Sequence, residues 1–106
     1  MEPGTIAVIF RAKRTSADAD GYAKAASEME ERAKTFPGYR GIHSVRGADG
    51  VGITISYWSN DEAARAWKAD SAHAAIREQG RAVWYEWYEL IVAQVTRDYS
   101  WQRPAD

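Results

Sequence analysis

The chain has 106 residues, of which 45% are hydrophobic and 27% charged, which predicts one globular domain over residues 1–106. Its 14 basic and 15 acidic residues are spread along the chain and give a net charge of −1, which excludes a basic surface for nucleic acid or anionic membrane. Cysteine is absent, and this excludes disulfides, thiolate metal sites and a cysteine nucleophile.

The first half of the chain predicts a strand and a helix. Residues 6–13 are rich in β-formers and begin with an apolar run, as in a buried strand. The polar stretch 15–20 supplies Ser16, Asp18 or Asp20 as a helix N-cap. Apolar residues then recur at three- and four-residue spacing, which predicts a helix ending before Pro37-Gly38.

The second half predicts a hairpin, a helix and a last strand. Residues 40–46 and 51–58 are strands joined by a turn with an Asp-Gly pair. Ser59 and Glu62 form a capping-box pattern at the start of a helix, and a short helical turn covers 71–80. The last strand is expected from about 85 to 99, and the tail Gln102–Asp106 is expected to fray.

The order β-α-β-β-α-β predicts a ferredoxin-like α+β fold, an antiparallel sheet with both helices on one face. The first and last strands are apolar on both faces, so the face without helices also needs a cover. We therefore expect a homodimer through the open sheet face. The longest apolar runs, Ile6–Phe10 and Leu90–Ala93, are too short for a membrane span or signal sequence, so a cytoplasmic location is expected.

Short motifs in a fixed order make the chain resemble the antibiotic biosynthesis monooxygenase family over about residues 5–101. The motifs are Gly38-Tyr39-Arg40-Gly41, Ser56-Tyr57-Trp58-Ser59, Glu62-Ala63, Ala66-Trp67, His73, Gly80-Arg81, Trp84-Tyr85 and Val92-Ala93-Gln94-Val95. The resemblance implies a dimeric α+β barrel. One branch of the family oxygenates aromatic phenols without metal or flavin, another degrades haem, and others act on quinols.

Three residues of the second hairpin strand are candidate pocket residues. Trp58 matches a position that lines the substrate cavity in the cofactor-free branch, and the small residues Thr54 and Ser56 share its face. Thr54 stands where that branch has an asparagine, which is a departure from the pattern. The alternative role for Trp58 is packing against the second helix.

His73 is the candidate general base. Asp70, three residues earlier, is placed to orient its imidazole, and Arg77 and Arg81 are placed to hold a substrate oxyanion. Oxygenation without a cofactor needs such a base, because the substrate must become an electron-rich anion that itself reduces O2. The alternative role for His73 and Asp70 is to cap a helix end at the surface.

Trp67 and Trp84 complete the candidate substrate-binding set. Trp67 also aligns with a haem-pocket tryptophan, with core packing as its alternative role. Haem degradation is disfavoured, because Ile76 and Arg77 occupy the place of the axial histidine and residues 6–13 contain no asparagine. No metal or other cofactor is expected, since the chain has only two histidines and they are far apart in sequence.

Three functions are compatible with the sequence, and it does not decide whether the chain is an enzyme. The first is a cofactor-independent monooxygenase acting on an aromatic phenol or quinol. The second is a non-catalytic, small-ligand-binding or stress-related dimer. The third is a haem-binding or haem-degrading monooxygenase.

Overall fold

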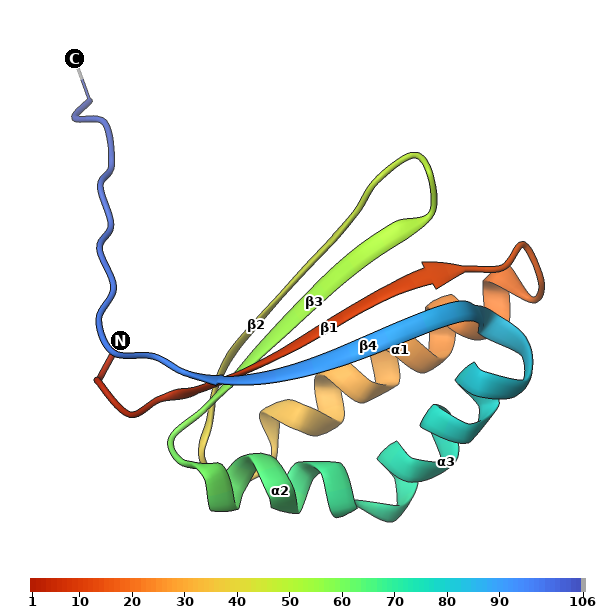
Figure 1. Ribbon diagram of the computed structural model, residues 1–106, viewed down its shortest axis with the longest axis horizontal. Helices are drawn as coiled ribbons and strands as arrows, with labels where there is room; N and C mark the ends of the chain where they lie inside the picture. Colours follow the sequence, from red (N-terminus) through yellow and green to blue (C-terminus); the bar gives the residue numbers. More distant parts are fainter. Residues whose placement is uncertain (106) are drawn as a thin grey trace.

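A computed structural model describes residues 1–105 and contains one four-stranded antiparallel sheet in the order β2-β3-β1-β4 (Figure 1). The strands are β1 (Ile6–Arg14), β2 (Tyr39–Arg46), β3 (Val51–Trp58) and β4 (Tyr85–Gln94). Each strand pairs antiparallel with its neighbours, and the connections from β1 to β2 and from β3 to β4 each pass over one intervening strand. This order confirms the predicted ferredoxin-like α+β fold.

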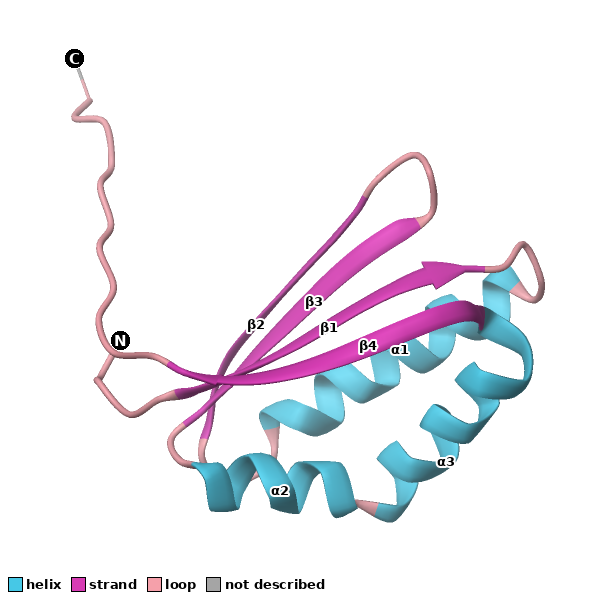
Figure 2. Cartoon of the chain, in the orientation of Figure 1, coloured by secondary structure: helices cyan, strands magenta, loops and turns pink. Residues whose placement is uncertain are grey.

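The helices all lie on one side of the sheet (Figure 2). They are α1 (Ala19–Lys34), α2 (Asp61–Ala69) and α3 (Ser71–Gln79), and a π-helical turn at Gly80–Trp84 leads from α3 into β4. The single predicted helical turn after residue 71 is therefore a full helix followed by a wider turn. The opposite face of the sheet carries no element of the described chain (Figure 1).

Polar side chains fix where the helices begin. Asp18 caps α1 by accepting from the Gly21 N–H, as one of the three predicted candidates. The predicted capping box on Ser59 is wrong, because Asn60 caps α2 by accepting from the Ala63 N–H at 2.8 Å. The Ser59 N–H instead donates to the Gly38 carbonyl at 2.8 Å, which keeps Ser59 in the turn that follows β3.

The last strand is shorter than predicted. β4 ends at Gln94, which lies opposite Ile6, the first residue of β1. Beyond it, Val95 makes two backbone hydrogen bonds with Gly4 and Thr5, and residues 96–105 then run on without a strand neighbour. β4 therefore ends opposite the first residue of β1, its neighbour in the sheet, and not where the amino-acid composition of the chain changes.

The strand register divides the side chains between the two faces. Ile6, Val8 and Phe10 of β1 point to the helix side, because Ile6 and Trp58, which lie opposite each other, both belong to the core with Ala64 and Trp67 of α2. Ile9 lies on the open face with its two cross-strand neighbours, Ile55 and Ile91. The open face is thus apolar at its centre, and Ile91 is 48% exposed.

Candidate functional site

Four rings form a continuous row between the sheet and the helices, which we call the aromatic row: Tyr39, Trp58, Trp67 and His73. Tyr39 packs edge-on to Trp58, whose ring lies nearly parallel to that of Trp67 with centroids 5.9 Å apart. The His73 imidazole stacks on Trp67 with centroids 4.3 Å apart and planes 18° apart. The row thus ends in the one titratable ring that ordinarily changes charge near neutral pH.

Secondary structure brings these rings together from four elements, with Tyr39 as the first residue of β2. Trp58 is the last residue of β3, Trp67 lies in the last turn of α2, and His73 lies in the first turn of α3. Asp70 separates the two helices with an extended backbone (φ −57°, ψ 130°), so the chain bends between Trp67 and His73. That bend lets residues six apart in sequence stack face to face.

The electrostatics of His73 favour a neutral imidazole. Burial lowers the pKa of His73 below its ordinary value, and the Arg77 guanidinium lowers it further, against an opposing contribution from the Trp67 carbonyl. Nδ1 lies 3.1 Å from that carbonyl, so in the neutral ring Nδ1–H donates and Nε2 carries the free lone pair. A neutral imidazole with one nitrogen committed is suited to accept a proton at the other.

Asp70 has the alternative role given above, that of a helix cap, and its side chain does not contact the His73 imidazole. Its carboxylate accepts two hydrogen bonds of 2.7 Å from the Arg32 guanidinium and one of 3.0 Å from the backbone N–H of His73. The Arg32 hydrogen bond is the main cause that lowers the pKa of Asp70 to about 2. Asp70 therefore caps α3 and ties it to α1, and it fixes the backbone of His73 while Trp67 fixes the ring.

The two candidate arginines reach different partners. Arg77, which lies one helical turn beyond His73, donates to the Lys68 carbonyl at 3.3 Å. Arg81 donates through Nε to the Tyr88 hydroxyl at 2.7 Å and pairs with Glu78 at 2.7 Å. The sequence did not predict that Tyr88 pairs with Arg81, because this contact depends on the π-helical turn that carries the chain into β4.

The remaining candidate residues lie in separate places. Thr54 shares a 2.8 Å hydrogen bond with Ser44 of β2, and Ser56 accepts from the Trp58 Nε1–H at 3.0 Å. Trp58 is fully buried, so in the single chain its indole has no surface to offer a ligand. Trp84 is buried with Tyr22 against it and donates through Nε1 to Asp18 at 3.2 Å.

Trp84 belongs to a second aromatic cluster, which lies near the start of α1 and the start of β4. The cluster contains Tyr22, Phe10, Tyr85 and Tyr88, with ring centroids 5.3–6.1 Å apart. Burial raises the pKa of the Tyr85 phenol, and the neighbouring Tyr22 hydroxyl adds to that effect. Tyr85 therefore stays protonated over the range in which His73 titrates.

Between the two clusters, the helix side of β4 is uncovered. Leu90 lies opposite Phe10 and Val92 opposite Val8, which places both on the helix side of the sheet. Yet Leu90 is 43% and Val92 53% exposed, more than a core position allows. The helices thus leave an apolar strip of β4, formed by Leu90 and Val92, open on the helix side of the sheet.

Neither a membrane-spanning helix nor a metal cluster occurs in the described chain. No helix in residues 1–105 is long and apolar enough to cross a membrane. Within the same residues, no group of three or more His, Asp or Glu side chains is arranged as a metal site.

The fold and the site together define a small ferredoxin-like domain whose sheet and helices enclose an aromatic row ending in a neutral histidine. The chain belongs to the antibiotic biosynthesis monooxygenase family, whose sequence model matches residues 5–79. This confirms the family resemblance and assigns the chain to a monooxygenase-type family.

Individual proteins are similar to this chain in sequence or in fold. The chain is 44% identical over 101 residues to the uncharacterized protein YqjZ of Bacillus subtilis, and the match covers 95% of this chain and 88% of that protein. Its fold is similar to SnoaB, a cofactor-independent oxygenase from Streptomyces nogalater, at 15% identity and a TM-score of 0.77 over 90% of this chain and 96% of that one. It is also similar to Rv0793 of Mycobacterium tuberculosis, at 14% identity and a TM-score of 0.79 over 91% and 99% of the two chains.

Proposed function

We propose that this protein is a cofactor-independent monooxygenase that acts on an aromatic phenol or quinol, with His73 as the general base. The observation that carries the proposal is the stack of His73 on Trp67, with Nδ1 committed to the Trp67 carbonyl. The stack holds a neutral imidazole in apolar surroundings and leaves Nε2 as the proton acceptor. The fold similarity to a cofactor-independent oxygenase supports the same reaction class.

The proposed reaction needs only the substrate and O2. His73 removes one C–H proton from the methylene group of a phenolic substrate, and the resulting carbanion, whose charge is shared with the substrate oxygen, transfers an electron to O2 and forms a C–O bond. The imidazolium returns a proton to give a hydroperoxide. Loss of the second C–H proton then breaks the O–O bond, so that the methylene group and one O2 become a carbonyl group and one water.

The residues near His73 have three different roles in this proposal. Arg77 lies next to His73 and supplies positive charge that favours the substrate oxyanion. Arg81 polarises the Tyr88 hydroxyl, so that Tyr88 can donate to a second oxygen of the substrate. Trp67 and the strip formed by Leu90 and Val92 supply the apolar contact area for the ring.

The buried candidates act indirectly in the same proposal. Trp58 supports Trp67 from within the core, and Ser56 fixes the Trp58 indole through its hydrogen bond. Thr54 borders the same face of β3, where its hydroxyl is shared with Ser44. Trp84 holds the start of β4 against α1 through Asp18, which keeps Tyr88 in place.

We further propose that the protein is a homodimer through the open sheet face. The centre of this face is Ile9, Ile55 and Ile91, and Val45 at its β2 side is 69% exposed. The Arg11–Glu89 pair, 2.7 Å apart, flanks the apolar centre and gives the face a polar border. An isologous pairing would bury the same residues on both copies.

Oxygen consumption by the purified protein tests the enzymatic part of the proposal. A panel of hydroxyanthrones and quinols is added at neutral pH without added metal or flavin, and O2 uptake is followed with an electrode. We expect uptake with at least one substrate, a quinone-type product and a 1:1 ratio of O2 to substrate for a hydroxyanthrone. A His73→Gln variant that retains the full rate would exclude His73 as the base.

A second candidate function is a non-catalytic dimer that binds an apolar ligand on the same strip. It is favoured by the complete burial of Trp58, whose only polar group is already bonded to Ser56. The two functions separate in one experiment: a ligand that quenches tryptophan fluorescence but is recovered unchanged under O2 indicates binding without turnover.

A further inference from the structure

Two arginine side chains meet at one tyrosine ring, at the end of the sheet where β1 and β2 stop. The Arg14 guanidinium lies 3.7 Å from the centre of the Tyr22 ring, and the Arg46 guanidinium lies 5.2 Å from it. Arg46 also donates through Nη2 to the Tyr22 hydroxyl at 2.7 Å. Arg14 is the last residue of β1, Arg46 is the last of β2, and Tyr22 lies in the first turn of α1. We call these three residues the Tyr22 cluster.

Main-chain carbonyls hold both guanidinium groups in place. Arg14 donates to the carbonyl of Trp84 at 3.2 Å and to that of Ala17 at 3.3 Å. Arg46 donates through Nη1 to the Gly50 carbonyl at 3.0 Å. These neutral partners fix the position of each side chain but leave its positive charge without a counter-charge.

The Tyr22 cluster lies on the helix side of the sheet. Gly52 of β3 lies opposite both Arg46 and Ala12, and Ala12 is on the same face of β1 as Ile6, which belongs to the core. Gly52 also makes room for the cluster, because a Cβ there would lie 3.3 Å from the Arg46 guanidinium. The cluster therefore does not depend on the open face or on the dimer proposed above.

No carboxylate pairs with either guanidinium group in residues 1–105. Neither Arg14 nor Arg46 has an acidic side chain within ion-pair distance, whereas four other arginines of the chain do. Two carboxylates lie near in sequence, but both accept other hydrogen bonds. Asp18 accepts from a main-chain N–H and from the Trp84 indole, and Asp49 accepts from a main-chain N–H. Two like charges therefore face one ring, and an anion between them would remove their repulsion.

We propose that the Tyr22 cluster binds a phosphate group, either free phosphate or the head of a phosphate monoester. A guanidinium group has five N–H donors, and Arg14 and Arg46 each use two of them within the protein, so that three remain on each. The planar fork of these donors matches the oxygens of phosphate. Two guanidinium groups also match the charge of the dianion that a phosphate monoester forms above pH ~6. The Tyr22 hydroxyl accepts from Arg46, so its own proton is left to donate to the same anion.

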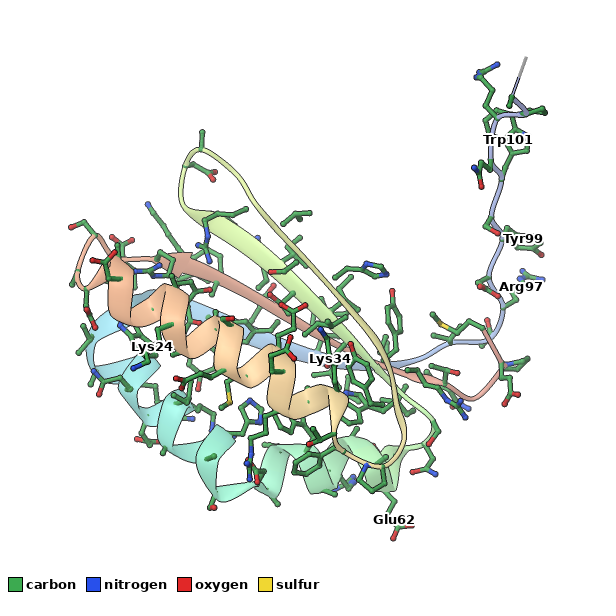
Figure 3. All side chains as sticks on the ribbon, turned by 180° about the vertical axis from the view of Figure 1, so that it is seen from behind. Lys24, Lys34, Glu62, Arg97, Tyr99 and Trp101 are labelled. Carbon is green, nitrogen blue, oxygen red and sulfur yellow. The ribbon has the colours of Figure 1, made fainter. Side chains whose placement is uncertain are left out.

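The phosphate site is separate from His73, and binding there goes beyond the proposed reaction. Tyr22 and Arg32 are ten residues apart in α1, about 15 Å along the helix axis, and Arg32 is the residue that ties α1 to the start of α3. Figure 3 shows this separation along α1, from Lys24 just beyond Tyr22 to Lys34 at the end of the helix. A phosphate group bound at the cluster would join the ends of β1 and β2 to the start of α1.

Thermal unfolding in the presence of inorganic phosphate tests the proposal. The purified protein is heated at pH 8 over a range of phosphate concentrations, with the ionic strength held constant by chloride. We expect a saturable rise in Tm, because a ligand that binds only the folded state stabilises it. Arg14→Gln and Arg46→Gln should each raise the apparent Kd at least tenfold. Arg40→Gln removes the same charge from an exposed position near the other end of β2 and should change the Kd less than twofold.

The indole N–H signals in NMR report where the phosphate binds. Trp84 packs edge-on against Tyr22, so phosphate should move its Nε1–H signal with the same midpoint as the rise in Tm. The Trp58 indole, which is buried and bonded to Ser56, should not move. Tyr22→Phe keeps the ring that packs on Trp84 and loses only the hydroxyl, so we expect a folded variant whose Kd is raised several-fold.

Three results would overturn the proposal. A rise in Tm that does not saturate, or a Kd that Arg14→Gln, Arg46→Gln and Tyr22→Phe all leave unchanged, would indicate an adventitious ion only. Acetate should bind at least tenfold more weakly than phosphate, and equal binding would exclude a site built for a phosphate group. Phenyl phosphate separates the two sources of the group: tighter binding than that of inorganic phosphate assigns the head of a monoester, and binding that is no tighter assigns free phosphate.

Discussion

The His73 imidazole and the Trp67 indole lie face to face with centroids 4.3 Å apart, and the carbonyl of the same tryptophan lies 3.1 Å from His73 Nδ1. Trp67 therefore sets the tautomer of the histidine and covers one face of its ring. Each of these properties can be measured separately.

The first prediction concerns the pH dependence of turnover. Because the pKa of His73 lies below its ordinary value of 6.5, we expect kcat/KM to rise with pH through a midpoint below 6.5 and to be level near pH 7. His73→Gln keeps a donor for the Trp67 carbonyl but cannot accept a proton, so the rate should fall about a hundredfold or more. Lys24→Gln, on the exposed side of α1, serves as the control. If kcat/KM of the His73→Gln variant still rises with pH through the same midpoint, the titrating group is not His73.

The second prediction concerns acid stability. The Arg32 pair lowers the pKa of Asp70 from 3.8 to about 2, so the folded state holds its proton less tightly than the unfolded state. The carboxylate thus stabilises the fold above pH 3.8, and this contribution is lost as pH falls toward 2. Asp70→Asn should lower the thermal midpoint most at pH 5 and progressively less toward pH 2.

Asp61→Asn is the matched control for that measurement. Asp61 also pairs with an arginine, Arg65, at 2.6 Å, but both side chains are largely exposed. Exposed pairs of this kind contribute little to stability. If Asp61→Asn and Asp70→Asn lower the thermal midpoint equally at pH 5, the special role of Asp70 is wrong.

Local signals predicted most of the fold, because each is encoded within a few residues. The Asp49-Gly50 turn fixed the hairpin, and the apolar spacing before Pro37 fixed α1, both within one or two residues. Ser59 and Asn60 are neighbouring residues of types that can cap a helix. The sequence predicted Ser59 as the cap of α2, whereas Asn60 caps it in the structure. A backbone contact between Ser59 and Gly38, 21 positions away, decided it.

The candidate site was less predictable, since its partners come from distant elements. Asp70 and His73 were expected to interact through their side chains, but Arg32 of α1 takes the carboxylate. The spacing of residues within one helix cannot predict that Arg32, 38 residues earlier, pairs with the Asp70 carboxylate. The end of β4 is a similar case, because the composition of a strand does not say where its neighbour begins.

The third prediction concerns the open face. Ile91→Glu places a charge beside Ile9, at the centre of the proposed interface. Since Ile91 is 48% exposed in the single chain, we expect the fold to tolerate the change and the dimer to dissociate. Sedimentation equilibrium gives the mass, and far-ultraviolet circular dichroism checks the fold. Ala26→Glu, on the exposed side of α1, should remain dimeric; an Ile91→Glu dimer of wild-type affinity would place the interface elsewhere.

The fourth prediction concerns substrate binding on the uncovered strip of β4. Leu90→Ala and Val92→Ala remove apolar contact area for an aromatic ring, so KM should rise several-fold while kcat changes less. Both side chains are already half exposed, and each change should cost only about 1 kcal/mol or less of stability. Val45→Ala, on the opposite face, is the control. An unchanged KM in both β4 variants would move the binding surface away from this strip.

The fifth prediction separates positioning from catalysis at Trp58. Trp58→Ala removes a fully buried ring and should cost about 3–5 kcal/mol, so its loss of activity alone decides nothing. Trp58→Phe keeps an aromatic ring beneath Trp67 but loses the N–H that Ser56 accepts. If Trp58 acts only by holding Trp67, the packing on His73 loosens, burial decreases, and the His73 pKa moves up toward its ordinary value.

Proton NMR of the two histidines follows that change directly, since only His43 and His73 give imidazole signals. We expect Trp58→Phe to move the His73 midpoint and the rising limb of kcat/KM upward together, with the maximal rate reduced by less than about tenfold. A rate reduced a hundredfold with an unmoved His73 midpoint would contradict positioning. It would mean instead that the indole itself contacts the substrate, which requires Trp58 to leave its buried position during turnover.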